Sequence, residues 1–555
     1  MDADTAPAPL GHRQVLVVFS GIMLGMFLAA IDQTIVATAL PTIAGELGGL
    51  AHLSWVVTAY LLAETVSTPL YGKLGDLYGR KRVFQSAIVV FLAGSVLCGL
   101  STSMGQLIAF RAIQGAGAGG IIVGAQALIA DIVSPRERGR YQGYFGAVFG
   151  VSSVAGPLIG GFLTEHASWR WVFYVNLPIG LVALVVTSAV LPASVRRARV
   201  RIDWLGTTVL SAAIVCLVLV TTWGGTEHAW GSPVIVGLAT AAVVLGVLFV
   251  VIERRVEEPA IPLRLFRNRT FNIASAVSLI IGAGMFGAIA FLPTFLQIGG
   301  GVSEANSGLL LVPVMAGLLI SSIAAGRRVS RTGRYRHFPI IGMAVAATGM
   351  GLLATLDADS SRLESGAYMF VLGAGLGMVM QILVLATQNE APVADLGVAT
   401  STVTFFRVVG GSLGVALAGA VINSRLTGAL GTEPPSDLTP QVLRSLPADE
   451  RAVLSTAYAD AITTVFAYAV PVLLVGFALT WLLRAVPLRT VAARVAAMAE
   501  AAGGPDGATH HATVPAAEVA GADGTEAPPP DGRSPSGPAP ADMMDGVGPA
   551  STSGG

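Results

Sequence analysis

The sequence predicts an all-α membrane protein that crosses the bilayer many times. Only 12% of its 555 residues are charged and 53% are hydrophobic, whereas a soluble domain carries about 25% charged residues. Apolar runs of about 20 residues recur along most of the chain, and each is long enough to cross the hydrocarbon core of a bilayer. The length of these runs also argues against a membrane β-barrel, whose strands would be short alternating segments.

Fourteen apolar runs are predicted as membrane spans. They cover residues 15–40, 54–71, 83–100, 107–130, 141–163, 171–191, 204–222, 233–252, 271–296, 307–325, 338–355, 367–387, 398–422 and 464–483. The first run is too long for a cleavable signal peptide, and no small-residue cleavage pattern follows it. The segment 424–462 is predicted as a long outer loop that contains a short surface helix at 447–461.

Basic residues alternate between successive loops. The loops after even-numbered spans carry Arg and Lys at 73–82, 136–140, 196–201, 254–269 and 327–336. The loops after odd-numbered spans carry only Arg170, Arg362, Arg425, Arg444 and Arg451. Because basic loops remain in the cytoplasm, the pattern predicts that residues 1–14 and the C-terminal tail are cytoplasmic. The inside loop 390–397 has no basic residue and departs from this pattern.

Two basic loops repeat one spacing. "GKLGDLYGR" starts at Gly72 and "GRRVSRTGR" at Gly326, and in each a glycine, Gly79 or Gly333, follows seven residues later and precedes an arginine. The first loop follows span two and the second follows span ten. This spacing predicts six spans in 15–191, two extra spans in 204–252 and six spans in 271–483. The alternative is two unrelated basic turns, which are common cytoplasmic connectors.

Four ionisable side chains lie well inside predicted spans: Asp32, Glu64, Arg111 and Arg407. Charges inside a membrane are costly and usually serve function. Asp32 lies about 12 Å from the outer end of its span and Arg111 about 6 Å from the outer end of its own, by the rise of a helix. These depths permit an ion pair or a water-bridged relay, with Gln114 one turn away as a hydrogen-bonding partner. Glu64 is left with three roles, as a substrate-binding acid, a second proton site or half of an ion pair.

Two spans are rich in glycine. "GAGAGG" at 115–120 fits GxGxxG, but it lacks the strand and helix N-terminus of a dinucleotide-binding loop, so it predicts close packing of a membrane helix. Span five contains Gly146, Gly150, Gly156, Pro157, Gly160 and Gly161. Because proline removes a backbone hydrogen bond, span five is predicted as a hinge between the two halves. A static packing face is the alternative.

Seven short motifs follow one another along residues 15–483. "GKLGDLYGRKRV" from Gly72 resembles motif A of the major facilitator superfamily, "RAIQGAGAGG" from Arg111 resembles motif B, and "GVSSVAGPLIGG" from Gly150 resembles the antiporter motif C. "IDQTIVATALP", "WRWVFYVNLPIG", "DWLG" and "FFRVVGGSLG" are similar to signatures of its fourteen-span drug:proton antiporters. The ordered set, rather than any single motif, carries the resemblance.

The resemblance implies two six-helix bundles around a central cavity that opens alternately to each side. It implies proton-driven export of drugs or antibiotics through the cytoplasmic membrane of a bacterium, and we expect a monomer. Asp32 is the expected proton-coupling acid. The resemblance also implies a gating latch between Arg80 and Asp131, beside Asp76 on the turn from Gly72 to Gly79. Lys81 and Arg82 are interpreted as residues of a solvated loop.

The cavity is expected to be mostly apolar. The polar and apolar candidates for its lining are Met26, Gln114, Gln297, Gln381 and Arg407, with Met23, Phe27, Met285, Phe286 and Met378. Flexible methionine side chains favour loose specificity. The alternative for each of these residues is packing within a bundle or contact with lipid.

No catalytic set, metal-ligand cluster or phosphate-binding loop is evident, so we expect neither enzymatic activity nor a cofactor nor a metal. The net charge of zero gives no electrostatic case for nucleic acid. The expected partners are a small-molecule substrate, protons and the lipid bilayer. Three other functions stay open: a dedicated exporter of one metabolite, lipid or siderophore, a proton-coupled nutrient importer, which motif C disfavours, and a non-transporting receptor, which leaves the buried charges unexplained.

Residues 499–555 are rich in Gly, Pro and Ala without periodicity, which predicts a disordered cytoplasmic tail. Truncation after Ala502 is therefore expected to leave the membrane level and the export rate unchanged, because such a segment cannot bury a core. Immunoblots of membranes and efflux from the same cells measure both quantities. A large loss of either would assign a function to the tail.

Overall fold

The computed structural model describes residues 12–47, 53–133, 135–191, 203–225, 227–257, 259–298, 311–357, 360–430 and 447–488. Regular structure in these residues is helical, apart from one isolated bridge between Gly224 and His228. The segment 1–11 and the tail 499–555, both assigned to the cytoplasm by the sequence, lie outside the described residues. The predicted all-α fold class is confirmed for the described part.

Each predicted span overlaps a helix. The first half of the chain forms α1 (His12–Leu47), α2 (Leu53–Tyr78), α3 (Arg80–Leu100), α4 (Met104–Ile132), α5 (Pro135–His166), α6 (Trp171–Tyr174) and α7 (Asn176–Val190). Two helices follow, α8 (Trp204–Trp223) and α9 (Pro233–Glu253). The second half forms α10 (Arg269–Ile298), α12 (Val312–Thr332), α13 (His337–Leu353), α14 (Arg362–Glu390), α15 (Leu396–Leu430) and α17 (Ala448–Thr480), with short 3-10 helices η2 (Leu263–Arg267) and η3 (Val393–Asp395).

Within the described residues, twelve helical segments are long and apolar enough to cross a membrane. The 17-residue α13 is shorter than these segments. Helix α2 also falls outside the twelve, and its sequence contains Glu64, Lys73 and Asp76. The structure therefore supports about a dozen spans by composition, and the full count of fourteen stays a prediction.

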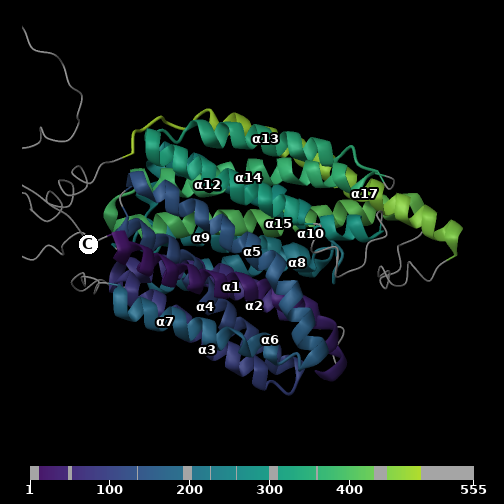
Figure 1. Cartoon of the computed structure of the whole chain (residues 1–555), viewed down its shortest axis with the longest axis horizontal. Helices are drawn as coiled ribbons and strands as arrows, with labels where there is room; N and C mark the ends of the chain where they lie inside the picture. The colour runs from purple at the N-terminus through teal and green to yellow at the C-terminus, as the bar shows by residue number, and fades with distance from the viewer. Residues whose placement is uncertain are drawn as a thin grey trace, which may run out of the picture. The chain divides into compact units, whose positions relative to one another are not determined.

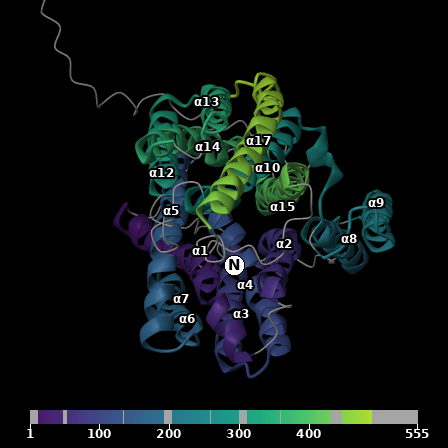
Figure 2. The same ribbon diagram turned by 90° about the vertical axis from the view of Figure 1, so that its right-hand side faces the viewer.

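The long helices form two groups with separate hydrophobic cores. In Figures 1 and 2, α1–α4, α6 and α7 (purple to blue) lie on one side, α10, α12–α15 and α17 (teal to yellow) lie on the other, and α5 lies between α1 and α12. Side chains such as Phe84 fill the first core, and side chains such as Leu376 fill the second. Helix α8 packs against α2, α15 and α9 at the edge of the two groups (Figure 2). The side chain of Val243 on α9 is 67% exposed, as expected for a lipid-facing helix.

Each of the two repeated loops contains a glycine with a positive φ. Gly79 separates α2 from α3 with φ +93°, and Gly333 ends α12 before α13 with φ +68°. Residues with a side chain rarely adopt these angles, whereas glycine does so readily. Each loop thus places a glycine at positive φ, but ψ differs, +128° at Gly79 and +3° at Gly333, and the internal repeat stays a prediction.

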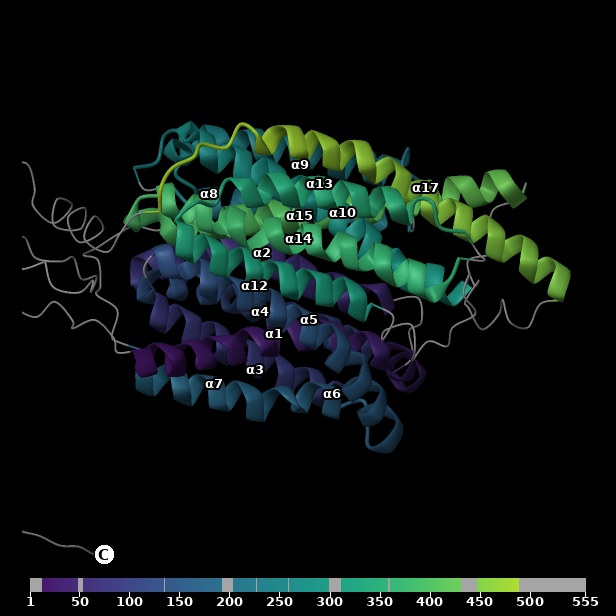
Figure 3. The ribbon, with the colours of Figure 1, turned by 45° about the horizontal axis from the view of Figure 1, so that its top comes forward.

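Two predicted elements differ from the structure. The predicted span 171–191 is interrupted at Val175, between α6 and α7. Pro178 explains this break, because it has no N–H to donate to the carbonyl of Tyr174. The predicted surface helix at 447–461 is wrong as a separate element, because α17 continues from Ala448 into the last span without an intervening Gly or Pro before Pro471. The first turns of α17 project beyond the other helices in Figures 1 and 3.

Lys81 also differs from its predicted environment. It lies in the first turn of α3, and its Nζ donates to the carbonyls of Ser188 (2.9 Å) and Leu191 (2.5 Å) at the end of α7. A lysine near a helix C-terminus satisfies carbonyls that have no partner within the helix. Arg82 is exposed, as expected.

Candidate functional site

A buried polar cluster lies inside the first half, centred on Asp32 of α1. The Asp32 carboxylate is fully buried and pairs through Oδ2 with Nη1 of Arg111 on α4 at 2.6 Å. Nε2 of Gln114 donates to Asp32 Oδ1 at 2.8 Å, and Arg111 Nη1 also donates to Gln114 Oε1 at 2.8 Å. The guanidinium of Arg111 lies over the ring of Tyr60 at 4.1 Å. The structure thus brings together Asp32, Arg111 and Gln114, which the sequence predicted as partners from their depths in the spans.

Two further residues in this cluster were not predicted. Nδ2 of Asn176, the first residue of α7, donates to Asp32 Oδ1 (2.7 Å) and to Ser95 Oγ of α3 (3.0 Å). Ser95 donates in turn to the carbonyl of Phe173, next to the break between α6 and α7. Asn176 lies in "WRWVFYVNLPIG", and its amide inside a predicted span is the sequence signal that could have identified it.

Glycines of α4 bring the cluster together. A Cβ at Gly117 would lie 2.5 Å from the backbone nitrogen of Phe91 on α3, and a Cβ at Gly119 would lie 2.5 Å from the carbonyl oxygen of Glu64 on α2. Helix α4 therefore packs directly on the backbones of α2 and α3, as small residues in membrane helices allow. The "GAGAGG" segment serves helix packing, in agreement with the sequence prediction.

Glu64 lies apart from the ion pair. It is buried on α2, and its Oε2 accepts a hydrogen bond from Nε2 of Gln33 at 2.7 Å. The described residues give it no ion pair. Among its three predicted roles, half of a buried ion pair is therefore wrong in this conformation. The roles of a substrate-binding acid and a second proton site remain predictions.

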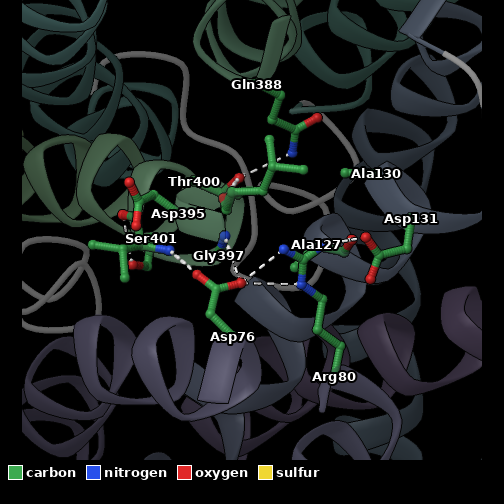
Figure 4. Close-up of polar contacts among 12 residues, drawn as sticks. Asp76, Arg80, Ala127, Ala130, Asp131, Gln388, Asp395, Gly397, Thr400 and Ser401 are labelled. Carbon is green, nitrogen blue, oxygen red and sulfur yellow. Dashed lines mark hydrogen bonds and ion pairs between the residues drawn. The ribbon is translucent and has the colours of Figure 1, made fainter. Parts of the chain in front are cut away.

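A second polar cluster lies where α2 ends and α3 begins. Arg80 pairs with Asp76 of α2 (Nη2–Oδ1, 2.7 Å) and with Asp131 of α4 (Nη1–Oδ1, 2.5 Å), as Figure 4 shows. It also donates to the carbonyl of Ala127 at 3.1 Å. The Asp76 side chain is 4% exposed, whereas that of Asp131 is 42% exposed. One buried guanidinium thus joins three helices of the first half.

Asp76 also bonds the second half. The backbone N–H groups of Gly397 and Val398, in the first turn of α15, donate to its Oδ1 and Oδ2 at 3.1 Å each (Figure 4). These N–H groups have no partner within their own helix, and a helix N-terminus favours a negative charge. Gly72 permits the approach, since a Cβ there would lie 2.9 Å from the carbonyl oxygen of Gly397. We refer to Asp76, Arg80 and the first turn of α15 as the clamp.

Helix α5 lies between α1 and the second half. At one end, a Cβ at Gly139 would lie 2.8 Å from the carbonyl of Gly326 on α12, and Gly146 contacts Leu318. At the other end, Gly156 and Gly160 pack against α1, beside Thr34 and Thr38 respectively. Gly150 contacts Met315 of α12, and Gly161 has open space around it. The helix continues through Pro157. The hinge role of these residues remains a prediction.

The predicted cavity residues differ in where they lie and in their hydrogen-bond partners. Met26 is fully buried in the core of the first half, and Gln114 belongs to the Asp32 cluster. Gln381 is buried, and its Oε1 has no partner among the described residues. Arg407 is 7% exposed, and the described residues give its guanidinium no hydrogen bond or ion pair. The side chain of Gln297, near the end of α10, lies outside the described part.

Other candidate lining residues range from buried to exposed. Met285 is buried, Phe286 is 40% exposed, and Met23, Phe27 and Met378 are half-buried. A polar contact between the halves was not predicted: Gln388 of α14 donates to the carbonyl of Gln126 on α4 at 3.5 Å and to Oγ1 of Thr400 at 3.0 Å. Sequence spacing carries no signal for this contact, because 262 residues separate its two partners.

Comparison with known proteins identifies the family. The sequence profile of the Major Facilitator Superfamily matches residues 22–415. The chain belongs to this superfamily. It is 47% identical over 482 residues to the uncharacterized MFS-type transporter Rv1877 of Mycobacterium tuberculosis (strain ATCC 25618 / H37Rv), which covers 86% of this chain and 70% of the relative. It is 41% identical over 406 residues to the multidrug transporter protein MdtP of Bacillus subtilis (strain 168). This alignment covers 73% of this chain and 75% of the relative.

Solved structures agree with the fold. The crystal structure of the human organic anion transporter MFSD10 matches with a TM-score of 0.58 at 15% identity, covering 84% of this chain and 99% of that one. This superfamily member is a multi-pass protein of the cell membrane.

Proposed function

We propose that this superfamily member is a proton-coupled exporter of hydrophobic or amphipathic small molecules, such as drugs and antibiotics, that works by alternating access. In this proposal the chain crosses the cytoplasmic membrane of a bacterium fourteen times, both termini are cytoplasmic, and the protein acts as a monomer. The observation that carries the proposal is the fully buried Asp32–Arg111 ion pair, tied by Gln114, within the first half.

Protonation of Asp32 removes the counter-charge of a buried arginine. A charge left unpaired in a membrane protein interior is costly, so the packing around α1 has to change. Two residues further along, Thr34 Oγ1 donates to the carbonyl of Ser152 on α5 at 2.9 Å. Because α5 packs on α12 of the second half through Gly139 and Gly326, a shift of α1 reaches the contact between the halves.

The clamp supplies the second element of the cycle. It joins the two halves at the end of the molecule where α2 ends, which the proposal assigns to the cytoplasmic side. The described conformation is then closed toward the cytoplasm, and export requires the bonds from Asp76 to α15 to break and re-form in each cycle. Helix N-terminal bonds to a carboxylate suit this purpose, because each is worth only about 1.5–3 kcal/mol.

Vesicle transport tests the function. Inverted vesicles are mixed with a panel of cationic and neutral dyes, and dye uptake into the vesicles is followed with an imposed pH gradient, without one, and after a protonophore. Uptake that needs the gradient supports the proposal. Uptake that is indifferent to both the gradient and the protonophore rules out proton coupling. Dyes that are never moved, combined with transport of one cellular compound, would favour the dedicated exporter, and inward movement in energised cells would favour an importer.

Glu64 is expected to matter most for cationic substrates. It is a buried acid whose described contact is the neutral amide of Gln33, so it can offer a counter-charge to a positive ligand. Glu64→Gln should lower export of cationic dyes about tenfold or more, the factor that corresponds to ~1.4 kcal/mol of lost interaction, and spare neutral dyes. Glu364→Gln, in the exposed first turn of α14, is the matched control. Equal losses for both dye classes would instead assign Glu64 to proton coupling or to structure.

A further inference from the structure

Asn176 has an unusual set of partners. It is fully buried at the start of α7, and its Nδ2 donates to Asp32 Oδ1 (2.7 Å) and Ser95 Oγ (3.0 Å). Its Oδ1 is buried and has no hydrogen-bond partner among the described residues. Buried acceptors without a partner are rare in folded proteins and unfavourable. This side chain therefore has one satisfied end and one free acceptor beside the acid.

The donors and acceptors around Asp32 show what the free acceptor can serve. The carboxylate receives hydrogen bonds from Arg111, Gln114 and Asn176, which suits its ionised form. A protonated carboxyl is itself a donor and needs an acceptor. Gln114 Oε1 already accepts from Arg111 and from Cys98, and Ser95 Oγ already accepts from Gln114 and Asn176. Asn176 Oδ1 is the neighbouring oxygen that accepts nothing among the described residues.

We propose that Asn176 is a positioning residue that responds to the protonation state of Asp32. Its amide N–H holds the ionised carboxylate, and rotation of the amide group by half a turn presents Oδ1 to the protonated carboxyl. The inference rests on the proposed function, in which Asp32 carries the proton. The rotation withdraws the Nδ2 bond from Ser95, which holds the carbonyl of Phe173 beside the break between α6 and α7. Protonation of Asp32 would thereby change the hydrogen bonds at the break between α6 and α7.

Other titratable groups near Asp32 also influence its charge. Arg111 of α4, Tyr60 and Glu64 of α2, and Cys98 of α3 interact electrostatically with it. The contribution of α7 to this cluster is a neutral amide. A change at Asn176 therefore alters the hydrogen bonds of Asp32 without adding or removing a charge, provided that the new side chain is neutral.

The experiment measures proton release on substrate addition as a function of pH, with the full-length protein in weakly buffered detergent. The cationic dye that gives the largest release with wild type serves as substrate. Asn176→Leu should move the midpoint upward by about one pH unit, because a hydrogen bond to the charged form outweighs one to the neutral form. Asn176→Asp, which keeps the size, should move it further, since two adjacent carboxylates hold a proton between them.

The controls separate positioning from structure. Asn389→Leu removes another buried asparagine, whose Nδ2 donates to the carbonyl of Pro487 at 3.3 Å, and it should leave the midpoint unchanged. A purely structural role for Asn176 would lower the amplitude of proton release without moving the midpoint, and that result overturns the inference. If Asn176→Leu fails to fold, the smaller neutral variant Asn176→Ala takes its place, because it also removes the amide without adding a charge. In wild type, infrared difference spectra across the midpoint should show a side-chain amide shift that Asn176→Asp removes, and its absence also overturns the inference.

Asp32→Asn separates a failure of the proposed function from a failure of the role of Asn176. Proton release that persists in Asp32→Asn contradicts the proposed function itself. Release that is lost in Asp32→Asn while both Asn176 variants keep the wild-type midpoint contradicts only the role of Asn176.

Discussion

Asp32→Asn is expected to abolish export driven by a pH gradient while substrate exchange at equal pH continues. Asn keeps the size of the side chain and cannot titrate. The carboxylate that pairs with Arg111 at 2.6 Å is lost, and a buried charge without its partner costs ~3–5 kcal/mol. The variant should therefore also unfold at a lower temperature in detergent. Loss of coupling together with retained exchange is the signature of a proton site rather than of a substrate site.

Proton release on substrate addition, measured with purified wild type and variant, checks this expectation. Asp460→Asn, an exposed acid of α17, serves as the matched control and should release protons normally. In the same assay Arg111→Ala should shift the pH dependence upward by about 1–3 units, because an arginine beside an aspartate lowers its proton affinity by that amount. Undiminished release from Asp32→Asn would remove Asp32 from the mechanism and leave Glu64 as the next candidate.

Asp76→Asn and Arg80→Ala are expected to slow transport at least about tenfold while substrate binding changes little. Asp76 accepts both N–H groups of the first turn of α15 and pairs with Arg80. An Asn side chain replaces one of its two acceptor oxygens with a donor, so it can no longer accept both bonds. The lost hydrogen bonds to a charged group are worth about 1.5–3 kcal/mol each. Because that energy holds the halves together at one end, the balance between the two conformations shifts.

Binding of a fluorescent substrate to purified protein, compared with its transport in vesicles, measures the two effects separately. Asp395→Asn is the control, since Asp395 lies just before α15 and pairs with Arg264 at 2.8 Å rather than with the first half. Asp131→Asn should have a smaller effect than Asp76→Asn, because its side chain is 42% exposed and exposed ion pairs contribute little. Normal transport by both Asp76→Asn and Arg80→Ala would mean that the clamp is not part of the cycle.

Much of the fold was predictable because the signals for it are local. Apolar runs located the helices, and the repeated spacing at Gly72 and Gly326 anticipated two loops with positive-φ glycines at Gly79 and Gly333. Helix ends were less predictable, as α17 shows, because the polar residues after Ala448 interrupt the hydropathy without interrupting the helix. The Asp32–Arg111 pair was predictable from depth, since a charge inside a span is costly and the two depths are compatible with a pair, given the length of an arginine side chain.

By itself, the sequence determined which residues form helices, which charges are buried and which glycines allow close packing, because each depends on neighbouring residues and on the bilayer. Only the tertiary structure decided which partners meet. Asn176 lies 144 residues from Asp32, and Gly397 lies 321 residues from Asp76. Nothing in either local sequence specifies the other, because hydropathy assigns a residue to the membrane and leaves its neighbours to helix packing. The orphan oxygen of Asn176 and the capping of α15 by the opposite half exist only once the helices have assembled.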